Sequence, residues 1–183
     1  MNSLLIPSAQ WIEPYLDIAD GKDLFRFHIQ DAFNYHGYDA VGGVVLGFRL
    51  LQRLSYQFNT DRKPLQRREI GLFTAFPGLG ARDCFELITR MVTDQRITVD
   101  TEFSDTTAQP GIYGRFYFQF SYQGQKLALA PIEGYPGAHF LKIGLASKQQ
   151  NVTAHTMQQW QKAKCDLANT LLSNRTEDVI RIL

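Results

Sequence analysis

The spacing of apolar residues in the first third of the chain predicts helices. Ser8 is a candidate N-cap for a short helix, and residues 1–22 are expected to form an N-terminal helical extension that Gly21 ends. A second helix is predicted over Asp23–Asn34, although its apolar stripe is imperfect. The apolar positions of the first helix are Trp11, Ile12, Tyr15 and Leu16.

The strongest helical pattern runs from Val44 to Phe58. Its apolar residues follow one another at steps of three or four, which places them on one helical face. Gly47 inside this helix costs about 1 kcal/mol relative to alanine, so we expect a tightly packed neighbour there. Gly42 and Gly43, just before the predicted start, suit a positive φ or a close backbone approach.

Strands and helices follow one another in the rest of the chain. Strict alternation of apolar and polar residues predicts strands, and Gln123-Gly124 is a two-residue hairpin connection. The elements expected are a polar loop over Asn59–Gln66, a strand over Arg68–Phe76, a turn at Pro77–Gly80, a helix over Arg82–Thr93, strands over Ile97–Phe103, Tyr113–Tyr122 and Lys126–Ile132, a loop over Gly134–Ala138, a helix over Thr153–Leu172 and a short strand or tail over Asp178–Leu183.

This order of elements predicts an α+β fold in which helices pack on a mixed, mainly antiparallel sheet. No internal repeat or linker interrupts the chain, so residues 1–183 are expected to form a single domain. Residues 153–183 would be its C-terminal helix and tail.

Composition excludes several classes of function. The formal net charge is +1, so no overall field attracts nucleic acid or an anionic membrane. No apolar run approaches the roughly 18 residues of a membrane span, and the short Leu4-Leu5-Ile6 run lacks a basic flank. The two cysteines, Cys84 and Cys165, form no C-x-x-C pair. We therefore expect a cytoplasmic protein with buried thiols, without nucleic-acid or membrane partners.

The candidate chemistry is concentrated in residues 34–49, at the entry to the central helix. His36 is the leading candidate, either as a metal ligand or as a proton-transfer group, because imidazole titrates near neutrality. Asp39 could act as a general base or orient His36, although a turn aspartate bonded to its own backbone is the commoner case. The residues expected to contact a ligand are Tyr35, Gly37, Tyr38, Gly42, Gly43 and His139.

The stretch H-G-Y-D-A-V-G-G-V-V-L-G-F-R resembles the signature of the FmdE family of formylmethanofuran dehydrogenase subunits. That signature is typically F-H-G-H-x-C-P-G, followed by an apolar helix that begins L-G-Y-R. Tyr35-His36-Gly37 matches the first part, and Leu46-Gly47-Phe48-Arg49 matches the second. Tyr38 and Ala40 stand where the family has its second histidine and its cysteine.

The resemblance implies an α+β fold, a homodimer and a pocket around His36. That pocket would bind a small molecule or a divalent transition metal such as zinc, or, as an alternative, a planar cofactor such as haem. A second hypothesis is a small-molecule enzyme in which His36 and Asp39 are the acid and base and the Gly78–Gly80 turn holds an anionic group. A third is a degenerate site in a structural or assembly partner.

Overall fold

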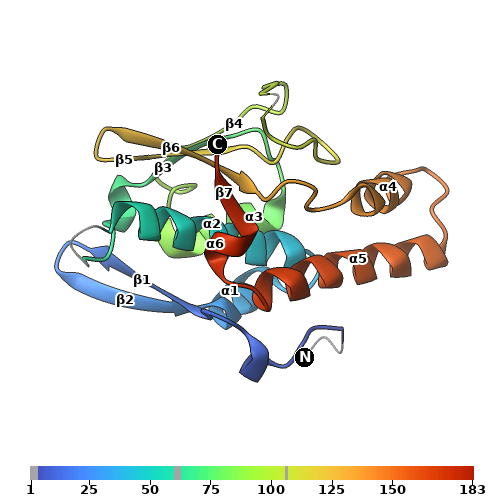
Figure 1. Cartoon of the computed structure of the whole chain (residues 1–183), viewed down its shortest axis with the longest axis horizontal. Coiled ribbons are helices and arrows are strands. Elements are labelled where there is room, and N and C mark those ends of the chain that lie inside the picture. Colours follow the sequence, from blue (N-terminus) through green and yellow to red (C-terminus); the bar gives the residue numbers. More distant parts are fainter. Residues whose placement is uncertain (1–3, 60–62, 106) are drawn as a thin grey trace.

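The structure is a computed structural model that describes residues 4–59, 63–105 and 107–183. Its main feature is a five-stranded sheet in the order β4-β3-β5-β6-β7, with helices α2 and α3 beneath it (Figure 1). β3 pairs in parallel with β4, and the other three pairings are antiparallel. The predicted α+β fold with a mixed, mainly antiparallel sheet is therefore confirmed.

The strands of this sheet are β3 (Gly71–Thr74), β4 (Ile97–Val99), β5 (Phe118–Tyr122), β6 (Gln125–Pro131) and β7 (Ile180–Ile182). In β5 every second residue is buried, as its alternation predicts. The ring of Phe85 on α3 meets those of Phe118 and Phe120 edge-on, at centroid distances of 6.3 and 5.8 Å. Gln123 and Gly124 close the predicted hairpin, both with positive φ.

The helices are α1 (Ile29–His36), α2 (Val41–Phe58), α3 (Leu79–Thr89), α4 (Ala138–Ala146), α5 (Ala154–Leu172) and α6 (Thr176–Val179), with short 3-10 turns at Ser8–Gln10 and Arg67–Glu69. α2 is the central element, because it is buried between α3 and α5. None of the helices in the described part of the chain is long and apolar enough to cross a membrane.

The predicted N-terminal helical extension is wrong. Residues Tyr15–Asp20 (β1) and Asp23–His28 (β2) form an antiparallel hairpin that lies at the lower left in Figure 1, below α2 and α3. Leu16 and Ile18 are buried two positions apart, which is the period of a strand. Gly21, with a φ of +62°, lies in the two-residue turn between the strands, and the Asp20-Gly21 pair is a turn signal that the helical prediction overlooked.

The helix predicted over Asp23–Asn34 is half right, because α1 begins only at Ile29. The backbone N–H of His28 donates to the Asp31 carboxylate at 2.7 Å and caps α1 there. α2 and α3 each begin three residues before the predicted start, and no element was predicted for α4. Residues 60–62 of the predicted Asn59–Gln66 loop lie outside the described residues.

Glycines let the helices approach one another closely around α2. A Cβ on Gly47 would lie 3.0 Å from the Cα of Ala81 and 3.1 Å from the Cβ of Cys84. A Cβ on Gly42 would lie 2.8 Å from a methyl carbon of Leu167. The tight packing predicted at Gly47 is confirmed, and Gly42 shows the same on the opposite side, facing α5.

Candidate functional site

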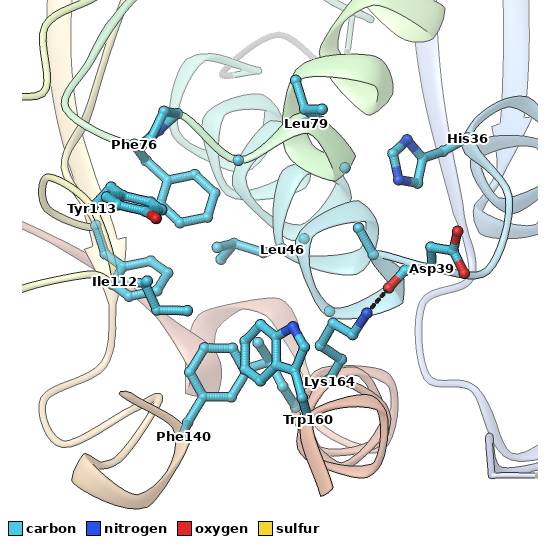
Figure 2. A pocket seen from close by; sticks show the side chains of 18 of the residues that line it. His36, Asp39, Leu46, Phe76, Leu79, Ile112, Tyr113, Phe140, Trp160 and Lys164 are labelled. Atoms are coloured by element: carbon cyan, nitrogen blue, oxygen red, sulfur yellow. Dashed lines mark hydrogen bonds between the residues drawn. The ribbon is translucent and has the colours of Figure 1, made fainter. Parts of the chain in front are cut away.

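A cavity of about 570 Å³ lies where the first turns of α2 and α3 meet α4, α5 and the 112–116 segment. This volume lies within the usual range for a small-molecule site. One wall is built from the start of α2, and another from the Phe76–Gly80 segment at the start of α3. In Figure 2, His36 and Asp39 lie on the side opposite Phe76, Ile112 and Tyr113.

The interior of the cavity is largely apolar and rich in aromatic rings. Phe76 stacks on Phe116 with ring centroids 4.8 Å apart, and Phe140 of α4 meets Trp160 of α5 at 4.8 Å. Leu46 of α2 lies between these two groups in Figure 2. Flat aromatic surfaces from separate elements favour a flat, apolar ligand.

α4 packs closely against the aromatic wall at Gly144, which is the one buried residue of this helix. A Cβ added there would lie 2.2 Å from the Cδ1 atom of Ile112 and 3.2 Å from the ring of Trp160. A glycine at this position thus allows α4 to cover one side of the cavity. The predicted loop over Gly134–Ala138 leads directly into this helix.

His36 is the last residue of α1, and its ring lies on the cavity wall. Its Nδ1 atom lies 2.7 Å from the Oδ2 atom of Asp83, which is on the second turn of α3. The His36 side chain is 12% exposed. A carboxylate bound to one ring nitrogen fixes the tautomer and the orientation of a histidine. Nε2 is then the nitrogen left for a ligand, which is the geometry of a general acid or base.

Asp39 does not take the orienting role that was one of the alternatives considered for it. It lies on the cavity wall, but its side chain is exposed and its backbone carbonyl accepts a hydrogen bond from the Nζ of Lys164 (Figure 2). Asp83 orients His36 instead. Sequence reasoning missed Asp83 because it lies 47 residues away along the chain, and no local spacing links α1 to α3.

The predicted ligand-contacting residues divide into two groups. Gly42 and Gly43 line the cavity, whereas Tyr35, Gly37, Tyr38 and His139 are not among the lining residues. Gly37 ends α1 with a φ of +91°. The Tyr38 ring stacks on Phe33, with centroids 5.5 Å apart, and its hydroxyl accepts from Gln30. His139 and Tyr35 are exposed.

Lys164 is a cavity residue that sequence reasoning did not single out. It lies on α5 one turn after Trp160, and its Nζ is 5.7 Å from the centre of that ring. Burial lowers the pKa of Lys164 below that of an ordinary lysine, although the nearby Asp39 carboxylate opposes this shift. The i, i+4 spacing of Trp160 and Lys164 was visible in the sequence, but it is common on solvated helices.

The lining residues do not fit a metal ion held by this chain alone. His36 is the one imidazole among them, and they include no cysteine. Within residues 4–59, 63–105 and 107–183, no group of three or more His, Cys, Asp and Glu side chains is placed to hold a metal. Stable sites generally use three or four protein ligands. The zinc or haem expected from the resemblance stays a prediction that needs ligands from elsewhere.

Cys84 is not placed as a nucleophile. It is buried between α3 and α2, and burial strongly raises the pKa of its thiol. A thiol held in this protonated state is a poor nucleophile.

Comparison with known proteins adds no relative: no protein-family model matches the chain, and no curated protein matches it significantly.

Proposed function

We propose that the protein binds a small, largely apolar organic molecule in the cavity between α2, α3, α4 and α5, and that His36, oriented by Asp83, exchanges a proton with it. The observation that carries this proposal is one contact, the 2.7 Å hydrogen bond that fixes the His36 ring on the wall of an aromatic-lined cavity. An imidazole held in this way suits proton transfer better than a freely rotating one.

Binding is tested by filling the mouth of the cavity. Leu79 lines the cavity and is 62% exposed, so Leu79→Trp adds bulk there without disturbing the core. Leu24 is similarly exposed, at 64%, but lies on the β1–β2 hairpin, so Leu24→Trp is a matched control. The assay is a thermal-shift screen of small planar molecules, because a ligand that binds the folded state raises the midpoint.

We expect ligands of the wild type to stabilise Leu24→Trp equally and to lose their effect on Leu79→Trp. Equal stabilisation of Leu79→Trp would place the binding site elsewhere. A screen without any stabilising molecule would overturn the proposal.

Proton transfer is tested on the ligands found in this way. Incubation with wild-type protein, followed by NMR of the small molecule, should show isomerisation or deuterium exchange from heavy water. His36→Gln should abolish this change while binding persists, and Asp83→Asn should slow it. A ligand that the wild type binds but leaves without exchange or conversion would reduce the function to binding alone.

A metal-binding function is the second candidate, and it follows from the resemblance around Tyr35-His36-Gly37 and from the position of His36 on the cavity wall. Elemental analysis of the purified protein, with His36→Ala as the control, separates the two candidates. Stoichiometric metal that His36→Ala loses would support the metal function.

A further inference from the structure

Lys164 lacks an acidic partner at close range. Among the described residues, no carboxylate oxygen lies within 4.0 Å of its Nζ, and its hydrogen bond goes to the neutral carbonyl of Asp39. Lys162, two residues earlier on α5, is exposed and pairs with Asp166 at 2.7 Å. The Asp39 carboxylate lies nearby but forms no ion pair with this half-buried side chain, so an anionic ligand in direct contact would offset the solvation free energy that burial costs.

The surroundings of Lys164 add partial positive charge. α2 and α3 both begin on the cavity wall, and neither has a side-chain cap at Ala40 or Gly78. The first hydrogen bonds within these helices run from Val44 to Ala40 and from Arg82 to Gly78. The backbone N–H groups that precede Val44 and Arg82 in the first turn of each helix have no acceptor within that helix. They therefore carry the positive end of the helix dipole.

The other charged groups that line the cavity are few. Lys148 is a second cation, and it is exposed. Asp39 is exposed, and the Asp83 carboxylate next to the cavity is already bound to His36. The charged side chains that line the cavity are thus two lysines and one aspartate, and many of the other lining residues are aromatic.

We infer that the cavity selects a planar, apolar molecule that carries one oxyanion, with the oxyanion against Lys164 and the planar body between the aromatic side chains Phe76, Tyr113, Phe140 and Trp160. This inference rests on the proposed binding function and names its ligand class. The oxyanion is a carboxylate or a phosphate ester, since both accept hydrogen bonds from an ammonium group.

The test compares probes that share one ring system and differ in charge. 2-Naphthoate and 2-naphthyl phosphate carry the oxyanion, and 2-naphthamide is the neutral match of the first. Their dissociation constants are measured by titration calorimetry with the wild type, with Lys164→Gln and with Lys162→Gln. The last variant removes the same charge from the same helix at an exposed position.

We expect an oxyanion probe to bind the wild type roughly tenfold more tightly than the amide, because a charge-assisted hydrogen bond contributes on this scale. The ratio of the dissociation constant of the amide to that of the oxyanion probe should stay the same in Lys162→Gln. In Lys164→Gln this ratio should fall towards one. The oxyanion probe that binds more tightly identifies the anionic group of the ligand as a carboxylate or a phosphate ester.

Equal affinity of the amide and the oxyanions for the wild type would overturn the inference and leave the binding function intact. A preference that survives in Lys164→Gln would overturn it as well. Failure of every probe to bind the wild type would overturn the inference, and a thermal-shift screen without any stabilising molecule would overturn the binding function as well.

Discussion

The Nδ1 atom of His36 and the Oδ2 atom of Asp83 lie 2.7 Å apart and join the end of α1 to α3. Because a carboxylate only accepts, Nδ1 must carry the proton in this contact. We predict that the neutral ring of His36 is held as the Nδ1–H tautomer in the wild type. Long-range ¹H–¹⁵N correlation spectra of the histidine rings measure this directly.

The tautomer experiment has two variants as controls. His36→Gln assigns the signal by removing it. Asp83→Asn keeps the size of the side chain but replaces the carboxylate, so the preference for the Nδ1–H tautomer should weaken. A wild-type spectrum showing mainly the Nε2–H form would contradict the orienting role of Asp83.

Gly47→Ala tests the close packing of α2 on α3. Alanine favours a helix by about 1 kcal/mol over glycine, but the added Cβ would lie 3.0–3.1 Å from backbone and side-chain atoms of Ala81 and Cys84. Overpacking of this kind costs roughly 1–3 kcal/mol. We therefore expect a net loss of about 0–2 kcal/mol in the free energy of unfolding, measured by urea denaturation.

Gly43→Ala is the matched control, one turn earlier on the same helix. Its added Cβ would meet its nearest neighbour, the backbone nitrogen of Ala81, at 3.4 Å, which is an ordinary contact. Here the helix propensity should dominate, so stability should stay the same or rise slightly. If both variants lose the same stability, steric crowding at Gly47 is not the cause.

Local patterns predicted the parts of the fold that depend on local physics. The Gln123-Gly124 turn fixed the β5–β6 hairpin, and the apolar spacing after Val44 identified α2. The prediction was wrong where the apolar spacing was compatible with both a helix and a strand. The segment that contains Leu16 and Ile18 was assigned to a helix, although these two residues are buried two positions apart in a strand.

The candidate site was predicted only in part, for a related reason. Sequence located the entry to α2 and His36, which do lie on the cavity wall. Asp83 and Lys164 reach that wall from α3 and α5, and such tertiary contacts have no local signature. The family resemblance and the homodimer it implies stay predictions.

Arg49→Met tests a buried arginine that links three parts of the chain. The guanidinium is fully buried and donates to the carbonyls of Ile12 and Leu171 and to the side chain of Gln52, at 2.7–2.9 Å. Loss of these donors leaves several buried acceptors unsatisfied. We expect the free energy of unfolding to fall by about 3–5 kcal/mol.

Arg53→Gln is the comparison for this effect, one turn further along α2. Arg53, whose side chain is 17% exposed, pairs at 3.3 Å with Glu177, whose side chain is 53% exposed. An ion pair with one solvent-exposed partner contributes little, so we expect a loss below about 1 kcal/mol. If the two variants lose the same free energy of unfolding, the buried hydrogen bonds of Arg49 contribute no more to stability than the ion pair of Arg53.

Glu86 gives stability a pH dependence that can be measured. Burial would raise the pKa of its carboxyl, but hydrogen bonds from Thr93 and from the backbone of Val92 outweigh burial and hold it below the usual value. A lowered folded-state pKa stabilises the protein above the unfolded-state pKa of about 4.3. This stability is lost as the pH falls through the folded-state value.

We therefore expect Glu86→Gln to be less stable than the wild type at pH 7, by roughly 1–3 kcal/mol in urea denaturation. The difference should shrink as the pH falls below about 4. Glu102→Gln, at an exposed position, should show no such difference. A difference for Glu86→Gln that stays constant down to acid pH would contradict the assignment to the carboxylate.

Ligand binding should depend on pH through Lys164. An oxyanion binds the ammonium form, so its affinity is highest below the pKa of Lys164 and falls as the pH rises through it. Because burial lowers this pKa, the fall should begin at a lower pH than the value of about 10.4 for an ordinary lysine. Titrations of 2-naphthoate between pH 7 and 10 measure it, with 2-naphthamide as the uncharged control. Lys164→Gln should flatten the profile, and a wild-type profile as flat as that variant would rule out contact between Lys164 and the oxyanion.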